Sequence, residues 1–148
     1  MNKNNTIFTI YYFLFFLAHL GFTTSLFSSS IWEEVREGNK IILIRHALAP
    51  GGGDPSSFKI GDCKTQRNLN KVGIEQSKKI GKIFKDNKIS IDIVLSSEWC
   101  RCKDTAFYAF RDFKEFSALN STFSPPYNEN ETRQVKEIEK YLMSWKGE

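Results

Sequence analysis

The sequence has little histidine and little cysteine, and it has no long block of charge of one sign. Two of its 148 residues are histidine and three are cysteine. Lysine and arginine total 21 against 17 acidic residues, for a net charge of +4 spread along the chain. A nucleic-acid-binding protein more often gathers its basic residues on one face, so we expect no nucleic-acid partner. A mildly basic chain can still accept a small anionic molecule.

The first thirty residues are typical of a targeting segment rather than of a folded domain. Residues 7–20 are apolar except for Thr9 and His19, a length typical of a signal-peptide core and short for a membrane span. An Ala-x-Ala cleavage site is lacking, although residues 28–30 are small serines. We expect a signal peptide over residues 1–30 and a periplasmic or secreted protein. An uncleaved membrane anchor is the alternative, and His19 receives no catalytic role.

The cysteines favour a disulfide over a metal site. Cys100 and Cys102 form a Cys-x-Cys pair with Cys63 far away, and no histidine lies near enough in the sequence to complete four zinc ligands. We therefore expect no metal. In an exported protein, three cysteines favour one disulfide, from Cys63 to either Cys100 or Cys102, with the remaining thiol free.

Residues 31–148 are expected to form one α/β domain. Hydrophobic periodicity and turn signals predict strands over 40–45 and 91–95, and helices over 31–37, 70–86, 99–110 and 128–145. Aliphatic strands that alternate with helices indicate a parallel sheet buried on both faces. Two parallel strands do not make an independent core, so we expect the sequence to be incomplete at its C-terminal end.

The helices and the long loop allow more detailed predictions. Asn70 is expected to cap the second predicted helix through its side chain. Residues 47–67 form a long predicted loop, and loops of this length are usually functional. The glycines at 51–53 lack the Lys-Ser/Thr pair of a phosphate-binding loop. In the last helix the expected buried residues are Val135, Ile138, Leu142 and Trp145.

Polar side chains follow both predicted strands. Arg45 and His46 end the first strand, and Ser97 and Arg101 follow the second. The carboxyl ends of parallel strands open onto one crevice, so these side chains are expected to face each other. Arginine binds phosphate oxygens in pairs, and a neutral imidazole can act as a nucleophile at physiological pH. The pattern predicts a phosphoryl site, and the alternative role of Ser97 is to cap the following helix.

Three segments resemble the motifs of the histidine phosphatase superfamily, also called phosphoglycerate mutase-like. IILIRHALAP resembles its Arg-His signature strand, with Ala47 where glycine is usual. Residues 62–81 resemble its Arg-x-Leu element with a following Gly and Gln, and residues 94–106 resemble its Ser-Ser element with a following Arg and Thr-Ala. The matching residues of these two elements are Arg67, Leu69, Gly73, Gln76, Ser96, Ser97, Arg101, Thr105 and Ala106. The likeness is greatest to small exported bacterial members.

The resemblance implies a three-layer α/β/α fold with a mostly parallel sheet, here without its C-terminal strands. It implies a phosphatase that hydrolyses phosphomonoesters through a phosphohistidine on His46, with neither metal nor cofactor. Arg45 and Arg101 would be phosphate ligands, and Ala47 would lie in the turn that orients the imidazole. Ser97 and Asp54 are further candidate phosphate or substrate contacts. The expected partner is a phosphorylated small molecule or phosphoprotein, with a membrane involved only if the N-terminal segment is retained.

Two points stay open in the sequence. Members of the superfamily carry a second histidine on a strand after the last helix found here, and this chain has no counterpart. The alternative function is therefore a truncated, catalytically impaired phosphate-binding protein of the same fold. The proton donor is open among Asp54, Glu98 and Glu129, and Asp54 is alternatively only a turn-forming residue before Pro55.

Overall fold

The computed structural model describes residues 30–123 and 125–147. The chain divides into two units, residues 1–30 and 31–148, and the second contains nearly all of the described residues. The expected signal peptide or anchor, including His19, lies outside the described residues apart from Ser30. Within the described part, no helix has both the length and the apolar character needed to cross a bilayer.

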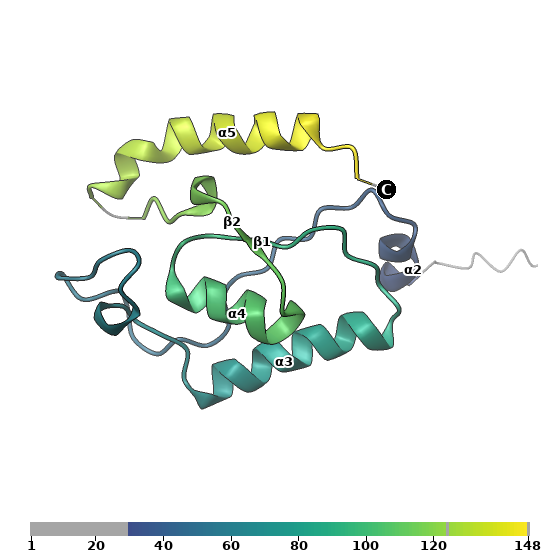
Figure 1. Cartoon of the computed structure of the whole chain (residues 1–148), viewed down its shortest axis with the longest axis horizontal. Helices are drawn as coiled ribbons and strands as arrows, with labels where there is room; N and C mark the ends of the chain where they lie inside the picture. Colours follow the sequence, from purple (N-terminus) through teal and green to yellow (C-terminus); the bar gives the residue numbers. More distant parts are fainter. Residues whose placement is uncertain (1–29, 124, 148) are drawn as a thin grey trace, which may run out of the picture. The chain divides into compact units, whose positions relative to one another are not determined.

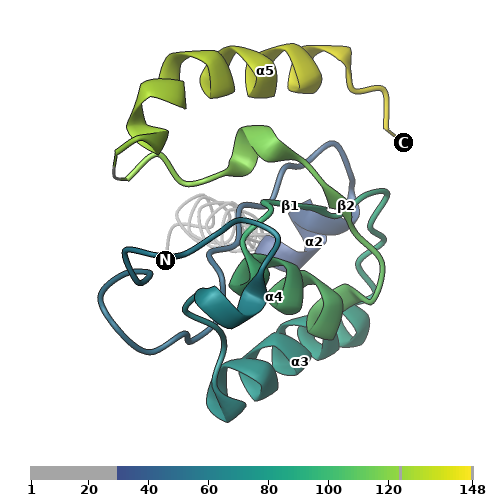
Figure 2. The same cartoon turned by 60° about the vertical axis from the view of Figure 1, so that its left-hand side comes forward.

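The second unit is broadly α/β, with helices and one small parallel sheet. Its described elements are α2 (Ile31–Arg36), η1 (Cys63–Thr65), α3 (Lys71–Asp86), β1 (Leu95–Ser96), α4 (Cys100–Phe110), β2 (Lys114–Glu115), η2 (Ser117–Leu119), η3 (Tyr127–Asn130) and α5 (Glu131–Ser144) (Figure 1). The strands pair in parallel, with Leu95 opposite Lys114 and Ser96 opposite Glu115, and α4 connects them. In both ribbon views β1 and β2 lie between α5 on one side and α3 with α4 on the other (Figures 1 and 2).

Helix α3 follows its sequence prediction closely. The side chain of Asn70 accepts the backbone N–H of Gly73 at 2.8 Å, which confirms the predicted cap, and the helix ends at Asp86. Helices α3 and α4 approach each other at Gly81, where a Cβ atom would lie 2.0 Å from the carbonyl oxygen of Ala109. This close approach packs α4, whose first turn carries Arg101, against α3.

The predicted strand over residues 40–45 is wrong in the described structure. The segment has no regular structure, and Ile41 and Leu43 are 63% and 88% exposed. No backbone–backbone hydrogen bond between described residues involves it. An aliphatic run becomes a strand only when a neighbouring strand pairs with its backbone, and β1 pairs here with β2 instead. The second predicted strand, 91–95, is likewise reduced to Leu95–Ser96.

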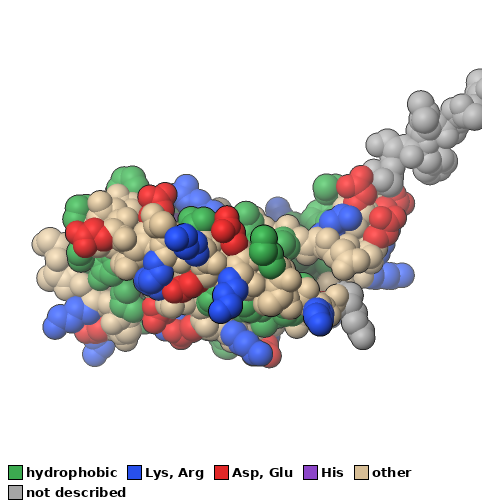
Figure 3. Space-filling model, turned by 90° about the horizontal axis from the view of Figure 1, so that it is seen from above, with side chains coloured by type: hydrophobic (Ala, Val, Ile, Leu, Met, Phe, Trp, Pro, Cys, Tyr) green, Lys and Arg blue, Asp and Glu red, His purple; other side chains and the backbone are tan. Residues whose placement is uncertain are grey.

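Helix α5 has the predicted position but not the predicted buried face. Val135, Leu142 and Trp145 are each at least 40% exposed, whereas Gln134 is only 4% exposed. The amide of Gln134 donates to the carbonyl oxygens of Ser117 and Asn120, both at 3.0 Å, so α5 rests on the polar backbone around η2. Figure 3 shows the α5 side of the molecule, where acidic and basic side chains are interspersed.

A disulfide joins the long loop to the start of α4. Cys63 and Cys100 are bonded, with a Cα–Cα distance of 5.6 Å, and Cys102 is free. This is one of the two pairings predicted from the sequence. Residues 47–67 are irregular, as predicted, except for η1 and an isolated bridge between Lys59 and Asp62. The disulfide therefore fastens a loop that has little regular structure of its own.

Candidate active site

Two of the polar residues expected to act together, His46 and Arg101, lie where the segment after His46 meets α4. Arg101, in the first turn of that helix, is 7% exposed, and His46 is half-buried. Asp54 and Arg67 join them from the long loop, and Arg45 is exposed at the edge. The site is thus assembled from a segment, a loop and a helix start that lie far apart in the sequence.

The ring of His46 is oriented by the backbone next to it. Its Nδ1 atom lies 2.7 Å from the carbonyl oxygen of Ala47. A carbonyl oxygen can only accept a hydrogen bond, so Nδ1 carries the proton and donates it. In the neutral ring Nε2 is then left with a free lone pair. This is the tautomer that a nucleophilic imidazole requires.

The surroundings of His46 favour its neutral form. Burial is the largest effect and lowers the pKa of the imidazole below its ordinary value of 6.5. The hydrogen bond to Ala47 opposes this shift, and the positive charges of Arg101, Arg67 and Arg45 lower the pKa further, in that order. Three guanidinium groups therefore act on one ring, and the lowered pKa favours its neutral form at neutral pH.

The segment that follows His46 is held by side chains from both helices. The N–H of Ala47 donates to the hydroxyl oxygen of Thr105 on α4 at 3.0 Å. The N–H of Leu48 donates to the side-chain oxygen of Gln76 on α3 at 2.9 Å. Because the carbonyl of Ala47 in turn holds the imidazole, these bonds fix the direction of Nε2.

Gly73 allows α3 to approach this segment closely. A Cβ atom at this position would lie 2.2 Å from the carbonyl oxygen of Leu48, closer than any packed atoms can come. That same carbonyl accepts the N–H of Asn70 at 3.3 Å. Gly73, Gln76 and Thr105 were quoted from the sequence as motif residues without a structural role. In the structure all three serve the backbone beside His46.

Arg101 forms a buried ion pair with Asp54. Its Nη1 atom lies 2.9 Å from both carboxylate oxygens, and both side chains are about one-tenth exposed. Asp54 also accepts from the indole N–H of Trp99 at 3.0 Å and from the backbone N–H of Arg67 at 2.9 Å. The structure thus occupies the oxygens of Asp54 with the protein's own donors, so its observed role is to hold Arg101.

The hydrogen bonds to Asp54 and the charge of Arg101 favour the ionised form of this carboxyl. Burial alone would raise the pKa of this carboxyl, but the hydrogen bonds from Arg67 and Trp99 and the charge of Arg101 outweigh it, and the pKa lies below its ordinary value. A carboxylate with a lowered pKa is a poor proton donor at neutral pH. Its charge also offsets one of the three guanidinium charges around His46.

Two buried N–H groups have no acceptor among the described residues. They are the Nε atoms of Arg67 and Arg101. Each arginine uses Nη1 within the protein, Arg67 toward the carbonyl of Ala49 and Arg101 toward Asp54. An unsatisfied buried donor costs about 1–3 kcal/mol, which an anionic acceptor would recover. The sequence analysis named Arg67 as a motif residue but did not include it among the candidate site residues. Its position in that motif was the one signal in the sequence that could have identified it.

The remaining predicted site residues are less engaged. Arg45 is exposed, and its charge has the smallest effect of the three on the pKa of His46. Ser97 is 6% exposed, and the hydroxyl of Ser96 donates to its carbonyl. Neither serine caps α4, which begins after Trp99 without a side-chain cap. The capping alternative for Ser97 is therefore wrong.

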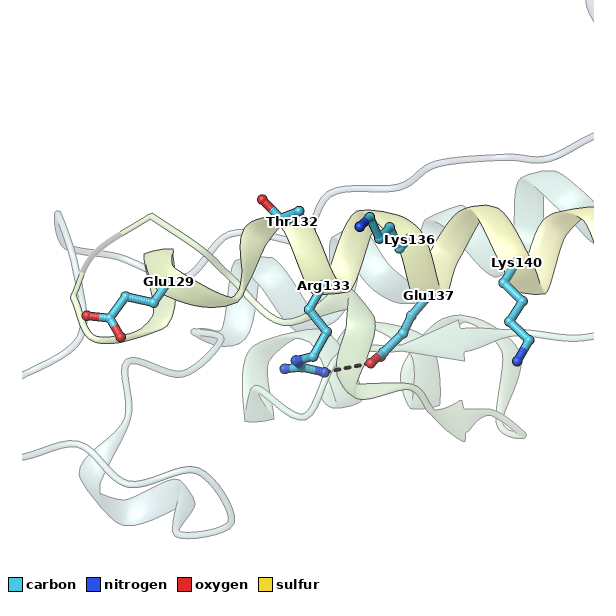
Figure 4. Close-up of a pocket in the computed structure, with 6 residues that line it drawn as sticks. All are labelled: Glu129, Thr132, Arg133, Lys136, Glu137 and Lys140. Atoms are coloured by element: carbon cyan, nitrogen blue, oxygen red, sulfur yellow. Dashed lines mark hydrogen bonds and ion pairs between the residues drawn. The ribbon is translucent and has the colours of Figure 1, made fainter.

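His46 does not line either of the two following surface hollows. One hollow, of about 510 Å³, runs along α5, where Arg133 pairs with Glu137 at 2.8 Å. Its lining residues are Glu129, Thr132, Arg133, Lys136, Glu137 and Lys140 (Figure 4). Another, of about 550 Å³, is apolar and lies between residues 40–44 and α2 with α3. No group of three or more potential metal ligands occurs among the described residues. The cluster around His46 is suited to a small anion.

Comparison with known proteins adds no identification. No protein-family model matches the chain, and no curated protein or solved structure matches it either.

Proposed function

We propose that this protein is a histidine phosphatase, which hydrolyses phosphomonoesters through a phosphohistidine on His46. The observation that carries the proposal is the state of that ring. Its Nδ1–H donates to Ala47, its Nε2 has no hydrogen bond to any described residue, and the charges of three arginines act on it. A neutral nucleophile surrounded by cations suits an anionic phosphorus centre, because the cations neutralise the charge on the equatorial oxygens.

The reaction would proceed by two displacements at phosphorus. In the first, the lone pair of Nε2 forms a bond to phosphorus, and the bond to the ester oxygen breaks with its electron pair. That oxygen takes a proton from solvent water and leaves as an alcohol. In the second, a water oxygen attacks phosphorus, the N–P bond breaks, the water proton is released and inorganic phosphate leaves. Arg101, with Arg45, would hold the phosphoryl oxygens in both steps.

The fold and the disulfide support related proposals. A strand–helix–strand unit with helices on both sides supports a three-layer α/β/α arrangement of the phosphoglycerate mutase-like type. The disulfide between Cys63 and Cys100 supports export to an oxidising compartment, periplasmic or extracellular. The substrate would then be a phosphorylated small molecule or phosphoprotein in that compartment.

A second candidate function is phosphate binding without turnover. It is favoured by the positions of the three carboxylates considered as proton donors. Asp54 is held by Arg101, Glu98 accepts from the amide of Asn120, and Glu129 lines the hollow on α5. Among the described residues, no hydrogen bond joins any of these carboxylates to His46. A protein of this kind would bind phosphate and release it unchanged.

Turnover and binding measured together separate the two functions. Hydrolysis of an aryl phosphate is followed by release of the phenol, and affinity for inorganic phosphate is followed by the imidazole NMR signals or by calorimetry. A phosphatase hydrolyses the ester, and His46→Ala stops it. A binding protein takes up phosphate but leaves the ester intact. A chain with neither activity would contradict both proposals, and Arg133→Gln on α5 is the control for charge removal at a distance.

A further inference from the structure

We propose that Arg67 binds the same phosphoryl group as Arg101, as a further guanidinium ligand of the site. This rests on the phosphate site proposed above and adds a residue to it. The two arginines come from different elements, the long loop and the first turn of α4. Each arginine would donate to the phosphoryl oxygens from the edge of its guanidinium group that carries Nε.

Arg67 is held by hydrogen bonds from its backbone and from its guanidinium group. Its backbone N–H donates to Asp54 at 2.9 Å, and its Nη1 donates to the carbonyl of Ala49. Along its stem, its Cδ lies 3.3 Å from where a Cβ of Gly51 would be. Its Nε is buried and has no acceptor among the described residues. A long side chain held this firmly has already lost the freedom that binding an anion would otherwise cost.

Arg67 is also connected to the element that carries Arg101. The neighbouring Gln66 is 7% exposed, and its side-chain oxygen accepts the N–H of Cys100 at 2.9 Å. Cys100 is disulfide-bonded to Cys63 in the same loop and directly precedes Arg101. The hydrogen bond from Cys100 to Gln66 and the disulfide from Cys100 to Cys63 therefore join the loop that carries Arg67 to the start of the helix that carries Arg101. These two links restrict the position of one guanidinium group relative to the other.

The charge balance fits a phosphomonoester. The charge of Arg67 lowers the pKa of His46 more than the charge of Arg45 does, so Arg67 has the stronger electrostatic effect on the ring. Asp54 neutralises one guanidinium group through its pair with Arg101. Arg45, Arg67 and Arg101 together then leave an excess of two positive charges, which matches a phosphate dianion. Without Arg67 the site would match only one of the two negative charges.

The test is the affinity of the oxidised, full-length protein for inorganic phosphate. Losing a charged hydrogen bond costs about 1.5–3 kcal/mol, so Arg67→Gln should weaken phosphate binding by about 10- to 100-fold. Arg133→Gln, which removes an exposed arginine from α5, should bind phosphate like the parent protein. An Arg67→Gln protein that is folded, disulfide-bonded and unchanged in phosphate affinity would overturn the proposal.

A second variant separates binding from positioning, because Arg67 also holds the carbonyl of Ala49. Arg67→Lys keeps the charge and a donor for Ala49 but loses the planar fork. If Arg67 only supports the loop, Arg67→Lys restores full phosphate affinity, and the proposal fails. If Arg67 is a ligand, Arg67→Lys stays several-fold weaker than the parent protein. Repeating the titration in His46→Ala keeps this result independent of turnover, so a failure of the phosphatase proposal would be seen separately.

Discussion

The hydroxyl oxygen of Thr105 lies 3.0 Å from the backbone nitrogen of Ala47 and accepts its N–H across 58 residues of sequence. Thr105 donates its own proton to the carbonyl of Arg101 at 2.7 Å, one turn earlier in α4. One buried side chain therefore connects the backbone that orients His46 to the residue that would hold the phosphate. The predictions below follow from contacts of this kind.

Replacement of Thr105 by valine should weaken both the fold and the site. Valine has a similar shape but leaves the buried N–H of Ala47 without an acceptor, which costs about 1–3 kcal/mol in the free energy of unfolding. Turnover of an aryl phosphate should fall as the imidazole loses its fixed direction. Urea unfolding and steady-state rates measure both effects. Thr132→Val on the exposed side of α5 is the matched control, and equal losses in the two variants would argue against this role for Thr105.

Gly73→Ala should be strongly destabilising. The new methyl group would lie 2.2 Å from the carbonyl oxygen of Leu48, so α3 or the segment after His46 must move. Overpacking of this kind costs about 1–3 kcal/mol or more. Gly52→Ala meets nothing within 4 Å and should leave the free energy of unfolding nearly unchanged. Two variants of equal stability in thermal unfolding would show that the close approach is not needed.

Asp54→Asn should leave Arg101 buried without its counter-charge. Removing one partner of a buried ion pair costs about 3–5 kcal/mol, whereas the exposed pair of Lys82 with Asp86 should contribute about 1 kcal/mol or less. The folded-state pKa of Asp54 lies below 3.8, so its contribution is present above pH 3.8 and is lost as the pH falls through the folded-state pKa. Denaturant unfolding of Asp54→Asn and Asp86→Asn at neutral and acidic pH measures the stability lost in each variant and its dependence on pH. If the stability lost in Asp54→Asn does not become smaller in acid, the pKa of Asp54 does not contribute to stability as described.

The pH dependence of turnover should reflect the lowered pKa of His46. In the proposed mechanism the nucleophile is the neutral ring, so kcat/KM should rise with pH along a limb whose midpoint lies below 6.5. Removing a positive charge lets the ring hold its proton more readily, so Arg67→Gln and Arg45→Gln should each raise that midpoint. The shift should be larger for Arg67, and NMR titration of the imidazole would measure it directly. Midpoints that stay unchanged or move down would contradict the electrostatic description.

The disulfide should contribute substantially to stability. A loop closed by residues 37 apart predicts about 4 kcal/mol from the restricted unfolded chain. Cys63→Ser should therefore unfold at lower denaturant concentration and bind phosphate more weakly, because the loop that carries Arg67 is released. Cys102→Ser removes a free thiol and should change neither property. A reducing agent should have the effect of Cys63→Ser on the parent protein and no further effect on that variant.

Local signals in the sequence predicted the helices well. Asn70 and the hydrophobic spacing after it located α3, because capping and periodicity act over a few residues. A parallel strand–helix–strand unit was predicted from strands 40–45 and 91–95, whereas the structure builds one from β1, α4 and β2. The predicted strand over residues 40–45 does not form. A strand needs a neighbouring strand whose backbone pairs with it, and a run of four aliphatic residues does not determine which segment that neighbour is. The edge strand Lys114–Glu115 was missed because both of its residues are exposed and charged.

The site was only partly visible in the sequence. His46 and Arg101 stood at expected strand ends, and the structure brings Arg101 near enough for its charge to act on the ring. The pairing of Asp54 with Arg101 spans 47 residues and depends on the path of an irregular loop, which no local pattern encodes. For the same reason the face of α5 was misjudged: what covers a helix is set by distant residues, here the backbone around η2.

The most direct test of the central claim is to trap the phosphorylated protein. The parent protein and His46→Ala are mixed with an aryl phosphate, quenched in alkali, where phosphohistidine survives, and mapped by peptide mass spectrometry. The account predicts a phosphoryl group on His46 of the parent protein and none on the variant. Hydrolysis of the ester with the phosphoryl group on another residue, or with undiminished turnover in His46→Ala, would contradict it.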